Sequence, residues 1–327
     1  MALAQREPRP VIALATLALV AAAALPPANA VPVEVTAPGP EGPLAGTLID
    51  PDPKAPAVLI LPGSGPTDRD GNNRGGVAGG PYRQLAEALA ADGIATLRVD
   101  KRGLFGSKAA LADPYASTTA GYAADTHAWV KMLRQRSGRR CVWVLGHSEG
   151  GLVALQAAQA PEGICGLILL SAGGRPIGAV MREQLRANPA NAPILDAALG
   201  AIDALEAGRR VDMASLPAVI QPLFAEKLQP YLIDLFSHDP AKLIAGVRLP
   251  VLILQGDRDI QVSLVDAEAL KKAQPKATLT IVPGVNHVLR PVESADRAAN
   301  IATYGDATLP ISPTIAAAIA AFVKRPG

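Results

Sequence analysis

The chain has 327 residues, of which 49% are apolar, and its formal net charge is only +2. This length suits one large globular domain or a domain with an insertion. The charge is nearly balanced and there are no runs of Lys and Arg, so composition gives no electrostatic reason to expect a nucleic-acid partner.

The N-terminus departs from globular composition. Arg6 and Arg9 precede an uncharged apolar run over residues 11–25, and small residues follow at Ala28 and Ala30. A basic start, a short apolar run and an A-x-A site are the three parts of a secretory signal peptide. The sequence therefore predicts a signal peptide that is cleaved after Ala30.

The alternative for residues 1–30 is an uncleaved membrane anchor. The apolar run is short for about 30 Å of hydrocarbon, and Pro26 and Pro27 break it just before the cleavage-like tripeptide, which favours cleavage. No later segment of the sequence is apolar for long enough to span a bilayer. We expect the mature protein, residues 31–327, in a periplasm or outside the cell, without stable membrane insertion.

Beyond residue 30, strand-like and helix-like blocks alternate. Continuous apolar strands separated by helices predict an α/β fold with a parallel sheet covered on both faces. Two earlier blocks, residues 31–37 and 44–50, are expected to add an antiparallel edge pair. The expected strands are residues 57–65, 94–100, 141–151, 163–174, 249–259 and 277–284, and the expected helices are residues 81–93, 119–138, 152–160, 264–274 and 313–325.

One interval, about residues 174–249, breaks this alternation. It shows helical periodicity over residues 177–187, 193–208 and 216–236, with no strand pattern. A structureless loop of this length is rare inside a compact domain. We therefore expect a helical insertion.

Ser148 lies in the pentapeptide Gly-His-Ser-Glu-Gly, between a predicted buried strand and a predicted helix. Gly146 and Gly150 flank it, as in a nucleophile elbow, where only small neighbours allow the strained turn that presents the hydroxyl. The first amides of the following helix carry partial positive charge and can stabilise an oxyanion. The pattern predicts that Ser148 is a nucleophile.

A serine hydroxyl is a poor nucleophile until a base accepts its proton. The chain has four histidines. His127 falls within a helix pattern, His147 within the elbow, and His238 just before the chain returns to the sheet, so each of these three is expected to be structural. His287 follows the last strand in "VPGVNHVL" and is predicted to be the base, with an orienting acid between it and Ser148.

The chain at this point resembles the α/β-hydrolase family over nearly the whole mature length. The resemblance rests on "GHSEGG", on "GDRD" after a late strand, on "VNHV" after the last strand and on "LPGSGP" after the first parallel strand. It implies a Ser-Asp-His hydrolase whose helical insertion, about 174–249, is a lid. It also implies an oxyanion hole formed by the backbone N–H groups of Ser64, with Gly65 as the alternative, and Glu149.

Two departures from the family pattern concern the loops around the site. In "DKRGLFGS", Phe105 stands where the family's Arg-Gly-x-Gly-x-Ser turn has its second glycine. Pro62 stands where many members have a histidine before the first glycine of the oxyanion loop.

The segment "LQGDRDIQVS" offers two acids, Asp257 and Asp259. Residues directly after Gly256 still follow the strand, so the later aspartate is better placed to turn back toward His287. The resemblance agrees, because Gly256, Asp259 and Val262 match the family's Gly-x-x-Asp-x-x-Val pattern. We expect Asp259 to complete the triad and Asp257 to cap a turn or pair with its neighbour.

Asp68, Asp70 and Asn72 alternate as in a calcium-binding loop. The rest of that pattern fails, because Asn73 and Gly79 stand where a glycine and a glutamate are needed. A turn rich in Asp, Asn and Gly is the preferred interpretation. With no cluster of His or Cys in the sequence, we expect no metal and no organic cofactor.

The residue set fits acyl transfer to water through an acyl-enzyme, and a small-molecule ester is the preferred substrate. A thioester, or an amide cleaved in an aminopeptidase-like reaction, remains open on the same triad. A non-catalytic binding protein of this fold is the alternative from a different class. The sequence leaves the oligomeric state undetermined.

The two cysteines, Cys141 and Cys165, open consecutive predicted strands. In the family that the chain resembles, those strands are neighbours, which implies a Cα separation suited to a disulfide, about 4.4–6.8 Å. Export would permit its oxidation. Two free buried thiols are the alternative.

Overall fold

The computed structural model of the protein describes residues 30–294 and 296–325. The predicted signal peptide therefore lies outside the described residues, except for Ala30. Within these two ranges, no helix combines the length and the apolar character needed to cross a membrane.

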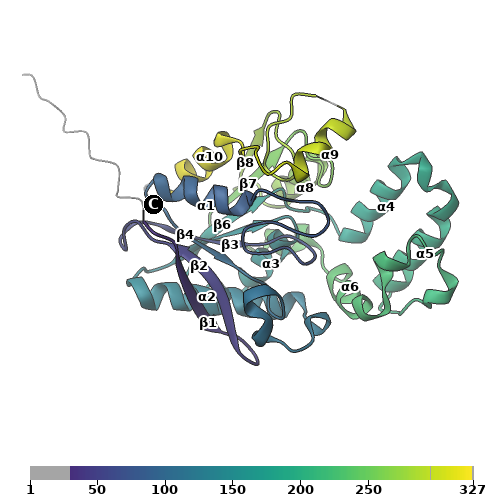
Figure 1. The fold of residues 1–327 in the computed structure, drawn as a ribbon, viewed down its shortest axis with the longest axis horizontal. Helices are drawn as coiled ribbons and strands as arrows, with labels where there is room; N and C mark the ends of the chain where they lie inside the picture. Colours follow the sequence, from purple (N-terminus) through teal and green to yellow (C-terminus); the bar gives the residue numbers. More distant parts are fainter. Residues whose placement is uncertain (1–29, 295, 326–327) are drawn as a thin grey trace, which may run out of the picture.

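In the described part of the chain, eight strands form one sheet (Figure 1). β1 pairs with β2, and β2 with β4, in antiparallel register, whereas the remaining pairings are parallel. The predicted α/β fold and its antiparallel edge pair are confirmed. In spatial order the strands are β1 (Val33–Pro38), β2 (Pro43–Ile49), β4 (Ala95–Val99), β3 (Ala57–Leu61), β5 (Val142–His147), β6 (Ile164–Leu170), β7 (Val251–Gly256) and β8 (Thr278–Val282).

Helices cover both faces of the sheet (Figure 1). On one face pack α1 (Pro81–Ala91) and α10 (Pro313–Val323). On the other lie α2 (Thr119–Ser137), α3 (Glu149–Ala157) and α8 (Leu264–Ala273). All five residues of β3 and of β4 are buried, including Thr96 and Arg98 of β4, because helices cover both faces of the sheet.

A helical segment joins β6 to β7 and extends from one end of the sheet (Figure 1). It contains α4 (Ile177–Ala187), α5 (Leu195–Glu206), α6 (Gln229–Phe236) and α7 (Pro240–Ala245). Phe224, Ile202 and Leu205 are among its fully buried side chains. The segment therefore has an apolar core of its own, which Leu152 of α3 joins to the rest of the protein.

The prediction of a helix over residues 216–236 is wrong for the first half of that range. Short 3-10 turns occupy Gln221–Phe224 and Glu226–Leu228, and α6 begins only at Gln229. Pro222 and Pro230 each lie in the first turn of their element. Proline lacks an N–H and clashes inside a helix, so each proline can start a helix but not continue one.

A second difference is α9 (Arg297–Gly305), a helix that was not predicted from the sequence. Only Asn300 of this helix is buried, so little of the helix packs into the apolar core. The available signal was Asp296, whose side chain accepts a hydrogen bond from the N–H of Ala299 as an N-cap.

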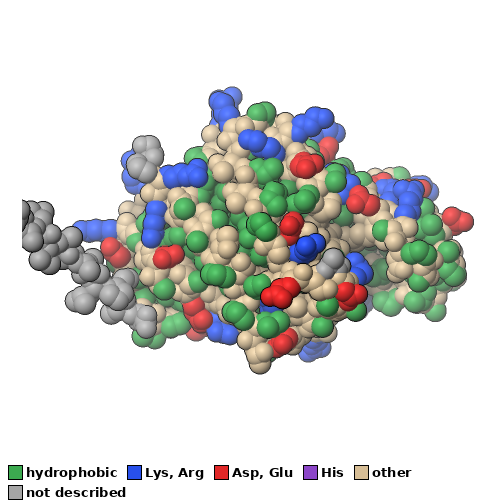
Figure 2. Space-filling model, turned by 90° about the horizontal axis from the view of Figure 1, so that it is seen from above, with side chains coloured by type: hydrophobic (Ala, Val, Ile, Leu, Met, Phe, Trp, Pro, Cys, Tyr) green, Lys and Arg blue, Asp and Glu red, His purple; other side chains and the backbone are tan. Residues whose placement is uncertain are grey.

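Charged side chains of both signs are interspersed over the face shown in Figure 2. In the helical segment, Arg182 pairs with both Asp203 and Glu206, and so ties α4 to α5. Exposed pairs of this kind contribute little to stability individually, and here they mainly set the surface chemistry of the segment.

Cys141 and Cys165 form a disulfide, with their Cα atoms 5.1 Å apart. Each cysteine immediately precedes or opens one of the neighbouring strands β5 and β6. The predicted bridge is therefore present in the structure, at the amino ends of the two strands.

Candidate active site

Ser148 lies between β5 and α3 in a backbone conformation with φ 54° and ψ −122°. A positive φ is strained for a residue with a side chain. The flanking glycines are required sterically, since a Cβ on Gly146 would lie 2.1 Å from the carbonyl oxygen of Gly150, and one on Gly150 would lie 2.6 Å from that of Leu61. The sequence thus folds into a tight strand-to-helix turn with the serine at its apex.

His287 follows β8, and its Nδ1 lies 2.8 Å from Oδ2 of Asp259. The Asp259 side chain is 0% exposed, and its other oxygen accepts hydrogen bonds from the N–H groups of Gln261 and Val262 at 2.8 and 2.9 Å. Burial alone would raise the pKa of Asp259, but the neighbouring His287 and these hydrogen bonds hold it below its usual range. The carboxylate is thus an ionised acceptor for the imidazole.

Asp257 is placed differently. Its Oδ1 accepts a hydrogen bond from the N–H of Gly284 at 2.7 Å, and Nε of Arg258 lies 4.0 Å away. Of the two aspartates after β7, only Asp259 contacts His287.

Ser148 and His287 line the same small cavity, of about 60 Å³. Asp259 does not line this cavity, but it contacts the imidazole of His287 through Nδ1. The structure therefore brings together the three residues that the sequence selected for a triad, from the elbow, from the loop after β7 and from the loop after β8.

The loop after β3 supplies backbone amides beside the serine. The N–H of Gly63 is already used, since it donates to Oη of Tyr82 at 3.1 Å. Among the described residues, the N–H of Ser64 has no acceptor. Glu149 is the first residue of α3, so its N–H has no partner within the helix. Both residues line a larger cavity that also reaches Ser148.

His147 connects the elbow to the loop that carries His287. Its Nδ1 lies 2.7 Å from Oη of Tyr82, and its Nε2 lies 2.9 Å from the carbonyl oxygen of His287. Burial, and next the charge of His287, lower the pKa of His147 to about 3. The neutral ring therefore donates from Nε2 and accepts from Tyr82 at Nδ1.

The Tyr82 hydroxyl in turn accepts from Gly63, so one chain of hydrogen bonds joins three loops. A structural role was predicted for His147 from the sequence, and no role was predicted for Tyr82. No local pattern distinguishes this tyrosine from other residues in the first turn of an amphipathic helix.

Glu149 has an ionic partner, Lys101, that was not predicted from the sequence. Nζ of Lys101 lies 3.1 Å from Oε1 of Glu149, and both side chains are 8% exposed. The same ammonium lies 3.3 Å from the carbonyl oxygen of Gly65. Lys101 thereby compensates a negative charge next to Ser148 and also contacts the loop after β3.

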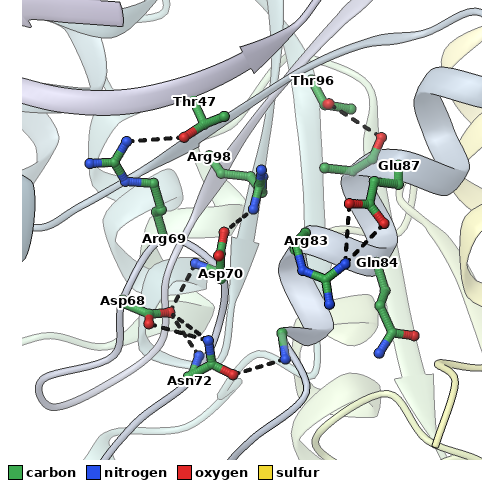
Figure 3. Close-up of polar contacts among 12 residues, drawn as sticks. Thr47, Asp68, Arg69, Asp70, Asn72, Arg83, Gln84, Glu87, Thr96 and Arg98 are labelled. Carbon is green, nitrogen blue, oxygen red and sulfur yellow. Dashed lines mark hydrogen bonds and ion pairs between the residues drawn. The ribbon is translucent and has the colours of Figure 1, made fainter. Parts of the chain in front are cut away.

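Two arginine–aspartate pairs hold the loop between β3 and α1 against the sheet, and Figure 3 shows the pair of Arg98 with Asp70. Arg69 donates to one carboxylate oxygen of Asp100 from Nε and Nη2, at 2.9 and 2.7 Å. Arg98 of β4 pairs with Asp70. Burial, and next the nearby Arg69, lower the pKa of Arg98 from its usual value. The loop that carries Ser64 is thus attached to the sheet rather than free.

The calcium-like stretch forms a turn within this loop (Figure 3). Oδ1 of Asp68 accepts hydrogen bonds from the N–H groups of Asp70 and Asn72, at 2.9 and 2.8 Å. Across residues 30–294 and 296–325, no group of three or more His, Cys, Asp or Glu side chains is arranged to hold a metal ion.

Phe105, the departure from the family turn, adopts a φ of 47°. It thus takes the left-handed conformation that glycine takes at no cost, and begins the 3-10 turn Phe105–Ala110. The backbone therefore keeps the turn despite the substitution.

The two remaining histidines do not line the small cavity. Nε2 of His238 is 2.9 Å from Oγ1 of Thr119 and from Nε2 of Gln156, at the edge of the larger cavity. His127 lies on α2 and lines a separate surface hollow.

Comparisons with known proteins identify the family of the chain. A model of the "Alpha/beta hydrolase family" matches residues 58–301. Esterase EstD of Thermotoga maritima is 28% identical over 268 residues, which are 80% of this chain and 58% of that relative. This chain therefore spans less than two thirds of the relative's length.

Solved structures share the fold at low sequence identity. An esterase of Pyrococcus furiosus superposes with a TM-score of 0.57 at 18% identity, covering 90% of this chain and 91% of that one. Est1E of Butyrivibrio proteoclasticus, bound to ferulic acid, gives 0.54 at 20% identity, covering 86% and 96%. With a matching family model over most of its length and an eight-stranded sheet of the same architecture, this chain belongs to the α/β-hydrolase family.

Proposed function

We propose that this protein is a serine hydrolase that cleaves carboxylic esters through an acyl-enzyme intermediate. The observation that carries the proposal is the hydrogen bond of 2.8 Å between Asp259 and Nδ1 of His287, at the cavity where Ser148 occupies its strained turn. The esterases among the relatives support ester substrates.

The proposed mechanism follows from the tautomer of His287. Asp259 accepts the Nδ1 proton, so Nε2 carries a lone pair and can take the proton of Ser148 as Oγ attacks the ester carbonyl. The N–H groups of Ser64 and Glu149 stabilise the oxyanion that develops. The protonated His287 then gives its proton to the leaving alkoxide, and a water attacks the acyl-enzyme by the same route.

Aminopeptidase-like chemistry is the second candidate, and it needs a free acid to hold the substrate amine. Glu149, which lines the larger cavity, is already paired with Lys101, and Glu183 on α4 is paired with Arg175, which also lines that cavity. On the outside of the helical segment, Arg182 engages Asp203 and Glu206. Because these acids are paired, they favour an ester substrate over an amide substrate that carries a free amine. A thioester substrate would contact the same groups as an ester.

We also propose export through the signal peptide over residues 1–30 and a lid role for the helical segment of residues 174–249. The Cys141–Cys165 disulfide supports an oxidising compartment. N-terminal sequencing of protein from the periplasm and medium is expected to begin at Val31. A mature chain that begins at Met1 would contradict the cleavage.

The function is tested on the protein lacking residues 1–30, with ethyl butyrate as the substrate and the release of acid as the measured quantity. Ser148→Ala is expected to lower kcat by at least about 10⁴-fold without unfolding the protein. Ser215→Ala, an exposed serine of the helical segment, is the matched control and is expected to keep full activity.

An organophosphonate is expected to add covalently to the Ser148 peptide, as read by mass spectrometry, and to leave Ser148→Ala unlabelled. Turnover of ethyl butyrate that survives Ser148→Ala would contradict the mechanism. Faster turnover of aminoacyl nitroanilides than of any ester would move the assignment to amide hydrolysis.

A further inference from the structure

Two cavities of very different size meet at Ser148. The smaller, about 60 Å³, lies under the loop between β3 and α1. The larger, about 340 Å³, lies between the sheet and the helical segment. Ser64, Ser148 and Gln261 line both cavities. The reacting carbonyl would therefore sit at their junction, with one half of the ester in each.

The position of His287 determines which part of the ester, the alcohol or the acyl group, lies in each cavity. The imidazole must give its proton to the leaving alkoxide, so the alcohol part of the ester has to lie on the side of His287. His287 lines the smaller cavity and not the larger one. Glu149 and Gly65, by contrast, line only the larger cavity. The acyl group is left to extend into the larger cavity, past the amide of Glu149.

The larger cavity has an apolar wall. Its lining includes Leu152 from α3, and Ile177, Met181, Leu232 and Leu235 from the helical segment. Burial of each methylene against such a wall is favourable, so a longer acyl chain gains binding energy as long as the cavity can hold it.

The charged groups in the same cavity are neutralised by partners. Arg175 donates to Asp266, whose side chain is fully buried, at 2.8 Å, and Glu149 pairs with Lys101 at 3.1 Å. A charged acyl group would have to compete with these partners, whereas an alkyl chain does not disturb them. The chemistry of the wall therefore selects an uncharged, apolar acyl group.

Resting on the proposed function, we infer that this site hydrolyses esters of a long apolar acid with a small alcohol, with the acyl chain in the larger cavity and the alcohol in the smaller one. The two halves of the substrate are thus not interchangeable. Reversing an ester, so that the long chain becomes the alcohol, places it in the cavity that cannot hold it.

Ethyl octanoate and octyl acetate test this directly, because they have the same atoms and differ only in which half carries the long chain. We expect kcat/KM for ethyl octanoate to exceed that for octyl acetate by at least about tenfold, given a gain of about fourfold for each buried methylene. Equal values, or a preference for octyl acetate, would overturn the inference.

The same assay separates this inference from the proposed function. Hydrolysis of ethyl acetate and ethyl butyrate that depends on Ser148, without a preference for ethyl octanoate, overturns the inference alone. No turnover of any ester overturns the proposed function, and the inference with it.

Variants then assign the preference to a cavity. Met181→Trp fills part of the larger cavity, and we expect it to lower the ratio of kcat/KM for ethyl octanoate to that for ethyl acetate by at least about tenfold. Val219→Trp makes a substitution of similar size in the same segment, at a side chain that is 71% exposed, and is expected to leave the ratio unchanged. Ile177→Phe gives a second, smaller filling should Met181→Trp fail to fold.

Val77→Ala is the opposite experiment, since Val77 lines the smaller cavity. We expect it to raise kcat/KM for octyl acetate relative to ethyl octanoate. If Met181→Trp and Ile177→Phe lower kcat/KM equally for ethyl octanoate and octyl acetate, the larger cavity does not hold the acyl chain and the inference fails.

Discussion

Nε2 of His147 lies 2.9 Å from the carbonyl oxygen of His287, so the residue before the proposed nucleophile holds the backbone of the proposed base. The two rings are also in contact, with centroids 4.7 Å apart. Because the other nitrogen of His147 is bonded to Tyr82, the ring has one orientation only. This contact fixes the distance between the elbow and the loop after β8.

We predict that His147→Phe lowers kcat by about 10- to 100-fold while the KM for ethyl butyrate changes little. Phenylalanine preserves the packing but cannot bond to His287, and a displacement of about 1 Å in a reacting group can cost 10²-fold. The loss of two buried hydrogen bonds should also lower the free energy of unfolding by about 1–3 kcal/mol.

Tyr82→Phe, which leaves the bond to His287 intact, is expected to affect kcat less than His147→Phe does. Steady-state kinetics and thermal melts monitored by circular dichroism measure both effects. A His147→Phe enzyme that is destabilised but keeps its full kcat would reduce His147 to a structural residue.

The titration of His147 predicts how stability depends on pH. Its pKa is about 3 in the folded protein and about 6.5 in the unfolded chain, so the unfolded state binds the extra proton between these values. The contribution of His147 to the free energy of unfolding is fully present above about pH 6.5. It falls by about 2 kcal/mol between pH 6.5 and 4.5.

The contribution of Asp259, whose folded pKa is also lowered, is lost only below the pH at which free aspartate titrates, about 3.9. Denaturant unfolding at pH 6.5 and 4.5 should therefore show a drop in stability that is smaller in His147→Phe. An identical drop in the two proteins would assign it to other groups.

The features that the sequence predicted and those it missed differ in how far apart along the chain their residues lie. The elbow could be predicted because Gly146, Ser148 and Gly150 are adjacent, and the steric conflict that requires the glycines is local. The pairs Lys101–Glu149 and Tyr82–His147 join residues 48 and 65 positions apart. Periodicity and local motifs carry no information on such pairs, which exist only once the sheet has formed.

The Lys101–Glu149 pair leads to a prediction on charge. We expect Lys101→Met to lower kcat by about 10-fold or more, because it leaves a carboxylate with an 8% exposed side chain unpaired beside the developing oxyanion. Adding Glu149→Gln removes that charge and should restore part of the rate. A double-mutant cycle on kcat measures the coupling. Additive losses would mean that the two side chains act independently.

The disulfide is expected to contribute to stability and not to catalysis. Cys141 and Cys165 are 24 residues apart in sequence, and a loop of this length restricts the unfolded chain by about 3 kcal/mol. Cys141→Ala with Cys165→Ala should lower the melting temperature and leave kcat at 25 °C unchanged, because the bridge lies at the amino ends of the strands and the site at their carboxyl ends. Two alkylatable thiols in the unreduced protein would show that the bridge does not form.

The two aspartates after β7 provide the sharpest test of the triad. Asp259→Asn is expected to lower kcat by about 10⁴-fold in folded protein, because an amide cannot both hold the correct tautomer of His287 and stabilise its protonated form. Asp257→Asn is the matched control, and it should change kcat by no more than about twofold. Its side-chain carbonyl can still accept from the N–H of Gly284, as the carboxylate does at 2.7 Å. Both rates are measured with ethyl butyrate after circular dichroism has verified the fold. If Asp257→Asn were the inactive variant and Asp259→Asn the active one, Asp257 would be the triad acid and the contact between Asp259 and His287 would be structural.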